Sequence, residues 1–287
     1  MVKFMMQKIT DVCPKAETIT SRTNPLVVVF SKLSQSKYRQ QQSLFLAEGK
    51  KLSREAAALS EIRYILLRST DGTADSEMLS IASKAPSRAR VIVLPPQVFE
   101  KISTENAPEG IITVLSPITR LHSVVSSPDT SAFDALKGQR ILAVDSVQDP
   151  GNLGTIIRTA AAFGYSRILL GGCADIYHPK TVRASMGALF RMSIDVCTSL
   201  VENLSALQKG GRRVLAAALS DSNLVLGKDK ILSDDCVVIG NEGHGVCAEI
   251  LSLADNVIRI PMRDGTESLN AAGAAAVLMW EYYRTFD

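Results

Sequence analysis

One stretch of the chain, residues 141–171, constrains the fold more than any other. An apolar run, Ile141–Asp145, leads into the polar sequence Asp149-Pro150-Gly151-Asn152. A segment with helical periodicity follows, and a turn at Gly164 then leads into a second apolar run, Arg167–Leu170. Strand, polar loop, helix, turn and strand in that order are typical of an α/β domain.

The helix expected between these two runs has an apolar face and a polar face. The apolar residues at helical spacing are Leu153, Ile156, Ile157, Ala160 and Ala161. Arg158 falls on the polar face, and Asn152 is a residue type that favours the N-cap position. By themselves Asn152 and Arg158 fit an ordinary capped helix with one solvated arginine better than they fit a functional pair.

Further apolar runs continue this pattern toward the carboxyl terminus. They are Val214–Leu219, Cys236–Gly240 and Val257–Ile260, with helical stretches between them. Short strands that alternate with helices predict a parallel sheet covered on both faces. We expect this domain to occupy residues 139–287.

Two later segments place polar residues beside this sheet. Gly240–Gly245 follows an apolar run directly and carries Asn241 and Glu242, which puts both at the carboxyl edge, where open α/β sheets bind ligands. Such a turn alone often does no more than join a strand to a helix. Ser268 is expected to cap the last helix and Asn270 to lie in its first turn, where asparagine gains little from helix propensity. Capping alone could explain Ser268, whereas the position of Asn270 favours a binding role.

A smaller α/β sandwich is predicted over residues 21–115. Its expected strands are Ser43–Ala47, Ile62–Leu67, Val91–Leu94 and Ile111–Leu115, and its expected helices are Gly49–Leu59 and a segment from Pro95 through Ile102. Residues 1–20 are interpreted as a flexible tail. Residues 116–138, which are rich in serine and proline, are interpreted as a linker.

Charge is unevenly distributed along the chain. The whole sequence has a net charge of +3, yet residues 1–54 hold ten Lys or Arg and three Asp or Glu, a net charge of +7. A basic segment suits contact with phosphates, although a solvated lysine-rich surface produces the same count.

Several classes of protein are excluded by what the sequence lacks. The five cysteines form no CxxC pair and the three histidines have no metal-ligand spacing, so we expect reduced thiols, a cytoplasmic location and no metal. No apolar run reaches the ~18 residues of a membrane span. A nicotinamide GxGxxG fingerprint, a Walker lysine, a GxSxG elbow and an HExxH pair are also missing.

Three strings, DPGNLGTIIRTAAAFG, IGNEGHGV and IPMRDGTESLN, together resemble the motifs of the SpoU (TrmH-like) family of RNA ribose 2′-O-methyltransferases in the SPOUT superfamily. They follow the family's order and spacing over most of residues 140–287. One departure is Ala271–Ala275, where many members have Val-Ser-Val-Ala. The resemblance implies an α/β domain with a trefoil knot, a homodimer, and S-adenosylmethionine as cofactor.

The resemblance also assigns residues to roles. It implies a catalytic set made of Arg158, Asn152, Glu242, Ser268 and Asn270. It implies that the cofactor is bound by Leu219, Gly240, Asn241, Ile260 and Leu269. A guanidinium is a poor base because it keeps its proton in proteins. We therefore interpret Arg158 as an organiser that binds a neighbouring phosphate and polarises the ribose hydroxyl.

The sequence Ser43–Gly49, followed by a helix, resembles the substrate-binding domain often fused to these enzymes, which is similar to ribosomal protein L30e and binds RNA. The implied RNA contacts are Arg22, Lys32, Lys37 and Arg39, cations of the kind that grip single-stranded RNA beside an aromatic ring. This domain favours rRNA over tRNA as the substrate. A tRNA 2′-O-methyltransferase and a non-catalytic RNA-binding protein of the same fold are the alternatives, and the sequence does not name the nucleotide that is modified.

Overall fold

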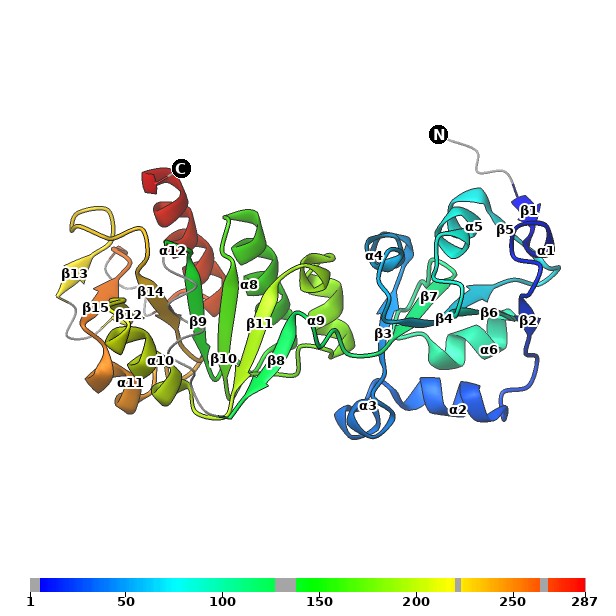
Figure 1. Cartoon of the computed structure of the whole chain (residues 1–287), viewed down its shortest axis with the longest axis horizontal. Helices are drawn as coiled ribbons and strands as arrows, with labels where there is room; N and C mark the ends of the chain where they lie inside the picture. The colour runs from blue at the N-terminus through cyan, green and yellow to red at the C-terminus, as the bar shows by residue number, and fades with distance from the viewer. Residues whose placement is uncertain (1–5, 127–137, 220–222, 264–267, 287) are drawn as a thin grey trace. The chain divides into compact units, whose positions relative to one another are not determined.

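The computed structural model describes residues 6–126, 138–219, 223–263 and 268–286, and the chain divides into two compact units (Figure 1). The first unit holds the residues up to Ile118 together with Tyr177–Phe190, and the second holds Thr119–Ile176 and the residues from Arg191 onward. Each unit is a mixed α/β structure with a sheet of its own. This arrangement confirms the predicted fold class of a parallel-sheet domain preceded by a smaller α/β domain.

The first unit is a five-stranded sheet between two layers of helices. Its strand order is β2-β6-β4-β7-β3, in which β2, β6 and β4 run parallel while β7 runs antiparallel to both β4 and β3. The strands are β2 (Glu17–Thr18), β3 (Phe45–Glu48), β4 (Ile62–Arg68), β6 (Arg90–Leu94) and β7 (Ile111–Leu115). The helices are α2 (Pro25–Lys32), α3 (Ser36–Gln42), α4 (Lys50–Ala56), α5 (Ser76–Ser83) and α6 (Pro96–Ile102). One core, which includes Phe30 and Phe99, lies between the sheet and α2 and α6.

The expected flexible tail over residues 1–20 is wrong for residues 6–20. Strand β1 (Met6–Lys8) pairs with β5 (Thr73–Asp75), the short helix α1 (Ile9–Val12) follows, and β2 pairs with β6. The physical reason is burial, because Ile9 is only 1% exposed and anchors this segment in the core. Residues 1–5 lie outside the described residues.

A segment from the carboxyl-terminal half of the sequence belongs to the first unit. It contains α9 (Pro179–Ala184) and the 3₁₀ turn η1 (Ala188–Phe190), and α9 packs beside β3. The ring of Tyr177 stacks on Phe45 with 4.3 Å between centroids, and Arg183 forms an ion pair with Glu105. A domain boundary drawn at one point in the sequence therefore does not describe this chain.

The second unit is an eight-stranded sheet whose paired strands all run parallel. The order is β13-β15-β12-β14-β9-β10-β11-β8. The strands are β8 (His122–Val125), β9 (Ile141–Asp145), β10 (Arg167–Gly171), β11 (Ser193–Cys197), β12 (Val214–Ala217), β13 (Leu224–Val225), β14 (Cys236–Ile239) and β15 (Asn256–Arg259). The five predicted strands of this domain, β9, β10, β12, β14 and β15, are confirmed within one or two residues at their ends.

Helices cover both faces of this sheet, as the parallel pattern predicts (Figure 1). Helices α10 (Leu200–Lys209) and α11 (Ala248–Leu253) pack on a core that includes Leu204 and Ile250. Helices α8 (Pro150–Ala162) and α12 (Ala271–Phe286) pack against each other. The beginnings of α8 and α12 thereby bring distant parts of the sequence toward the carboxyl ends of β9 and β14.

Part of the expected linker, residues 116–138, is a strand instead. Residues His122–Val125 form β8 at the edge of the eight-stranded sheet, where they pair with β11. The Ser123 hydroxyl donates a hydrogen bond to the carboxylate of Asp195, so this edge is held by side chains as well as by the ladder. The remaining part of the expected linker, residues 127–137, lies outside the described residues.

Candidate active site

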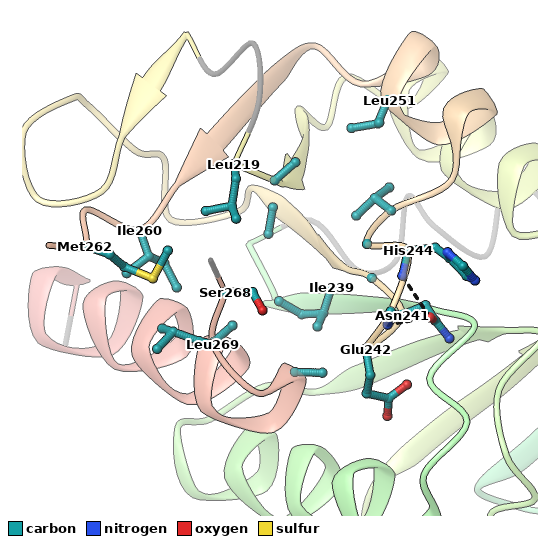
Figure 2. Close-up of a pocket in the computed structure, with 18 residues that line it drawn as sticks. Leu219, Ile239, Asn241, Glu242, His244, Leu251, Ile260, Met262, Ser268 and Leu269 are labelled. Atoms are coloured by element: carbon teal, nitrogen blue, oxygen red, sulfur yellow. Dashed lines mark hydrogen bonds between the residues drawn. The ribbon is translucent and has the colours of Figure 1, made fainter. Parts of the chain in front are cut away.

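A cavity of about 470 Å³ opens in the second unit, beyond the carboxyl ends of β12, β14 and β15 (Figure 2). Its walls come from three separated parts of the sequence, and the lining residues that carry the argument are Leu219, Gly240, Asn241, Ile260, Ser268 and Leu269. A ligand site at the carboxyl edge of a parallel sheet is the position expected from this topology.

All five residues predicted to bind the cofactor line this one cavity: they are Leu219, Gly240, Asn241, Ile260 and Leu269. Two of the five are apolar side chains left open to solvent, since Leu219 is 49% exposed and Leu269 is 40% exposed. In Figure 2 both side chains are directed toward the hollow. Exposed leucines on a concave wall are what a partly apolar ligand such as a nucleoside would cover.

The turn Gly240–Gly245 forms one rim of the cavity and is closed on itself. The N–H of Asn241 donates to the carbonyl of Gly245 at 2.9 Å, and the N–H of Gly245 donates to the carbonyl of Asn241 at 3.0 Å. The Asn241 side chain accepts from the N–H groups of Gly243 and His244, at 2.8 and 3.1 Å. Asn241 is therefore occupied in shaping this turn, which supports the backbone edge that faces the cavity.

Three of the predicted catalytic residues form one hydrogen-bonded network beside the turn. The Asn270 amide donates to Oδ1 of Asn152 at 3.1 Å, and the Asn152 amide donates to Oε1 of Glu242 at 3.0 Å. The Glu242 carboxylate also accepts the backbone N–H groups of Gln148 and Asp149, both at 3.2 Å. The sequence predicts these three residues as a set, and the structure brings Asn152 together with two residues that follow it by 90 and 118 positions.

The charge of Glu242 is maintained by this network. Partial burial raises the pKa of its carboxyl, but the hydrogen bonds from Asn152 and from the backbone of Gln148 and Asp149 outweigh burial, and the net pKa is lowered. The stabilisation from these bonds is therefore present at neutral pH and is lost only as the pH falls through the pKa of the folded state. Glu242 accordingly acts as an anionic hydrogen-bond acceptor near neutral pH.

Two expected helix caps are corrected. Helix α8 begins at Pro150, and its N-cap is Asp149, whose carboxylate accepts the N–H of Asn152 at 2.8 Å. Asn152 thus lies inside the first turn, and its side chain is free to join the network. At α12 the cap is Asn270 rather than Ser268, because Asn270 Oδ1 accepts the N–H groups of Ala272 and Gly273, at 3.0 and 3.3 Å. Ser268 lines the cavity instead.

Arg158 lies on the exposed face of α8, two turns beyond Asn152. Leu153, Ile156, Ile157 and Ala160 on the opposite face are buried, as predicted. Among the described residues Arg158 has neither a hydrogen-bond partner nor an ion-pair partner, and it does not belong to the network of Asn152, Glu242 and Asn270. Its guanidinium is therefore available to a ligand.

Three of the four predicted RNA contacts are exposed and one is not. Arg22, Lys32 and Lys37 are exposed, and the Lys32 ammonium lies 4.9 Å from the centre of the Tyr38 ring. Arg39 is only 5% exposed and donates from one guanidinium nitrogen to the carbonyls of Leu33 and Ser34, both at 2.8 Å. The prediction for Arg39 is wrong, because this side chain holds the α2–α3 connection.

Asp145, Ser146 and Gln148 were not among the predicted site residues, although they contact the turn or its neighbours. Gln148 donates from its side chain to the carbonyls of Ser146 and Gly172, at 3.1 and 2.6 Å. Asp145 accepts the N–H of Cys247 at 2.8 Å. An acidic residue at the end of an apolar run was the available sequence signal for Asp145.

The cysteines are not poised for chemistry. Burial raises the pKa of the thiols of Cys173, Cys197 and Cys236 to about 12, so these thiols stay protonated at neutral pH. The described residues contain no group of three or more His, Cys, Asp or Glu that could hold a metal ion. A search of the same residues found no helix both long and apolar enough to cross a membrane.

Comparison with protein families divides the sequence much as the structure does. Residues 139–280 match the SpoU rRNA Methylase family, and residues 24–113 match the MRM3-like substrate binding domain. The first match covers the cavity, the network and α8. The second covers most of the five-stranded sheet and the helices around it.

Individual proteins extend the similarity over nearly the whole chain. The 23S rRNA (guanosine(2553)-2′-O)-methyltransferase RlmP of Bacillus subtilis is 31% identical over 266 residues, which cover 91% of this chain and 97% of that protein. An uncharacterised tRNA/rRNA methyltransferase of Synechocystis is also 31% identical, over 93% of both chains. The structure of an AdoMet-bound rRNA methyltransferase from Sinorhizobium meliloti has a TM-score of 0.79 and 29% identity, and covers 95% of this chain and 99% of its own.

Proposed function

Because the chain belongs to the SpoU rRNA Methylase family, we propose that it transfers a methyl group from S-adenosylmethionine to the 2′-hydroxyl of a ribose in ribosomal RNA. The observation that carries this proposal is the adjacency of two features. The cavity lined by Leu219, Gly240, Asn241, Ile260 and Leu269 shares Glu242 with the network of Asn152 and Asn270. A cofactor bound in the cavity would therefore lie next to a ribose held by the network.

The residues of the cavity fit a nucleoside with a charged sulfonium arm. The exposed leucines offer apolar contact, while the turn and the segments at Ile260 and Leu269 offer backbone groups. When bound, S-adenosylmethionine supplies an electrophilic methyl group for direct attack by an oxygen nucleophile. The protein's contribution is chiefly placement, which supplies much of the acceleration in such transfers.

Arg158 completes the proposed mechanism from outside the network. Its exposed guanidinium binds the phosphate next to the target ribose and polarises the 2′-hydroxyl as the hydroxyl proton leaves to solvent. Asn152 and Asn270, fixed by Glu242, orient the ribose, and Ser268 adds a hydroxyl at the cavity wall. The oxygen–methyl bond forms as the sulfur–methyl bond breaks, which leaves S-adenosylhomocysteine and 2′-O-methylated RNA.

The direct test uses cofactor carrying a labelled methyl group and purified rRNA or tRNA from cells that lack the protein. We expect label in rRNA, and a single 2′-O-methyl position restored when sites are mapped with and without the protein. Label in tRNA alone would select the tRNA enzyme. Tight RNA binding with no label in either RNA would select the non-catalytic alternative.

RNA capture is assigned to the first unit. Arg22, Lys32 and Lys37 are exposed, and the Lys101 ammonium donates to the carbonyl of Arg22 at 2.8 Å, which places a further cation beside Arg22. We also propose that this unit is an RNA-binding domain similar to ribosomal protein L30e. Deleting the unit is a poor test, because Thr181, Ser185 and Leu189 are buried within it and would become exposed.

Charge reversal of Lys32 and Lys37 to glutamate should weaken RNA binding about uniformly across sequences, because interactions with phosphates carry little sequence information. The slope of log affinity against log salt concentration should become shallower by about one for each phosphate that the protein no longer neutralises. Filter binding at several salt concentrations measures both effects. The matched control reverses two exposed lysines of the second unit, Lys228 and Lys230, to glutamate and should change neither. Equal losses of affinity in both variants would assign the effect to overall charge.

A homodimer is proposed from an exposed aromatic face on the second unit. The rings of Phe163, Trp280 and Tyr283 lie 5.4 to 5.9 Å apart, and Trp280 is 50% exposed. Exposed apolar patches of this kind mark interaction surfaces. Sedimentation should show a dimer for the wild type and a monomer for Trp280→Glu, while Lys209→Glu, at an exposed position of α10, stays dimeric. A monomeric wild type, or a dimeric Trp280→Glu, would contradict this interface.

Two further properties are proposed with the family. One is a trefoil knot in the carboxyl-terminal part of the second unit. There the cavity-lining residues Leu219, Gly240 and Ile260 lie just beyond the ends of β12, β14 and β15, and β12 pairs with both of the other strands although neither follows it directly in sequence. The other is a cytoplasmic location, where the protein meets its RNA substrate.

A further inference from the structure

Asp145, at the end of β9, is a buried carboxylate for which the proposed mechanism has no use. It is 6% exposed, and among the described residues it has no ion-pair partner. Burial of a carboxylate costs free energy unless hydrogen bonds compensate. Both of its oxygens are in fact used, since Oδ2 accepts the N–H of Cys247 at 2.8 Å and Oδ1 accepts the Ser146 hydroxyl at 2.9 Å.

The next residue, Ser146, is held in an unusual backbone conformation. Its φ of 58° lies in the left-handed region, which costs a residue with a side chain roughly 1–2 kcal/mol. In this conformation the Ser146 carbonyl accepts the side-chain amide of Asn241 at 2.7 Å. The Gln148 amide donates to the same carbonyl at 3.1 Å. The side chains of Asn241 and Gln148 therefore hold the strained conformation through hydrogen bonds to this carbonyl.

Asp145 and Ser146 form hydrogen bonds to the two ends, or legs, of the turn Gly240–Gly245, which we call the cofactor turn. Ser146 holds Asn241, the second residue of Gly240–Gly245, and Asp145 holds Cys247, two residues beyond its end. Between these points the turn is already closed by the paired N–H and carbonyl groups of Asn241 and Gly245. Both legs of the turn are therefore tied to the end of β9.

We propose that Asp145 and Ser146 form a clamp on the cofactor turn, and that Asp145 is a positioning residue for cofactor binding. The proposal rests on the proposed function, because it assigns the clamp to the cavity that would take S-adenosylmethionine. A turn that is already in place loses less conformational freedom when the ligand binds, so the clamp acts on affinity for the cofactor. Neither residue touches the reacting atoms, and kcat at saturating cofactor should change less than the cofactor KM.

The test compares three variants by calorimetry with S-adenosylhomocysteine. Asp145→Ala removes the acceptor of the Cys247 N–H, and the Kd should rise by at least about tenfold, the scale expected for removal of a hydrogen bond to a charged group. Asp145→Asn should stay within about threefold of wild type, because its amide oxygen can accept the Cys247 N–H and its amide nitrogen can donate to Ser146. Asp195→Ala is the control, since Asp195 is also buried in this sheet but pairs with Arg167 and Ser123 away from the cavity.

Unchanged affinity in a folded Asp145→Ala variant overturns the clamp, as does a loss of affinity in Asp145→Asn equal to that in Asp145→Ala. Should Asp145→Ala fail to fold, Cys247→Pro decides the question. Proline fits the Cys247 backbone, whose φ is −66°, and it removes the N–H that Asp145 accepts, so the Kd should rise by at least about tenfold. Unchanged affinity in that variant overturns the proposal. Absence of binding by the wild type would instead reject the proposed function and the clamp with it.

Discussion

Replacing Gly240 with alanine should raise the Kd for S-adenosylhomocysteine by about 100-fold or more. A Cβ at this position would lie 2.1 Å from the carbonyl carbon of Gly245 and 2.2 Å from the nitrogen of Val246. Both are backbone atoms, and the paired hydrogen bonds of the turn hold them in place. Relief of the overlap must open the turn, and overpacking of this kind typically costs about 1–3 kcal/mol and occasionally more.

A matched control lies three residues further along the same turn. A Cβ at Gly243 would lie 3.5 Å from the nearest atom, Oδ1 of Asn241, which is an ordinary contact. Gly243→Ala should therefore bind the ligand within a few-fold of wild type. Calorimetry gives both affinities, and circular dichroism establishes that Gly240→Ala retains its secondary structure. If folded Gly240→Ala binds as tightly as Gly243→Ala, the cofactor lies somewhere other than against this turn.

The parts of the fold that were predictable are those in which a buried strand is a continuous apolar run. Strands β9 and β14 are of this kind, and each is buried along its whole length. Strand β11 was missed because Ser193 and Asp195 interrupt it, and Asp195 is tolerated there through its ion pair with Arg167 and its hydrogen bond from Ser123. Serine and proline around β8 are typical of a linker, and its pairing with β11 is a tertiary effect.

The membership of α9 in the first unit could not be predicted from sequence. Helical periodicity shows that a segment has a face to bury, but it does not identify the surface that covers that face. Here the covering surface is β3, more than 130 residues earlier, with Tyr177 stacked on Phe45. The same holds for the amino-terminal segment, whose buried residues, Ile9 and Cys13, were too weak a signal.

The candidate site was predictable in its residues and not in its connections. Motif order located every residue of the network, yet local rules assigned Asn152 and Ser268 to the wrong roles. Asp149 followed by Pro150 was the stronger start signal for α8, because proline at the first helical position and an acidic N-cap act together. The hydrogen bonds that Asn152 donates to Glu242 and that Asn270 donates to Asn152 depend on how α8, α12 and β14 pack.

Arg158→Ala should lower turnover by at least about 100-fold while leaving folding and cofactor affinity near wild type. The side chain lies on the exposed face of α8, and none of the described residues bonds to it, so its removal creates neither a cavity nor an unpaired buried group. The effect of the substitution should therefore be seen only when RNA is bound. Single-turnover methylation with labelled cofactor measures the rate of methyl transfer. Thermal unfolding measures the stability of the fold, and calorimetry measures the affinity for the cofactor.

Two variants sharpen this test of Arg158. Arg158→Lys should restore little activity, because an ammonium cannot reproduce the planar fork of donors that a guanidinium offers to a phosphate and a hydroxyl. Thr155→Ala, one turn earlier on the same exposed face, removes a hydroxyl that donates to the Gly151 carbonyl of its own helix and should stay within a few-fold of wild type. Near wild-type methylation by Arg158→Ala would remove this residue from the mechanism and leave the network of Asn152, Glu242 and Asn270 to position the ribose alone. A solvated arginine on a helix surface contributes little to stability. If Arg158→Ala nevertheless unfolds, the role of Arg158 is structural.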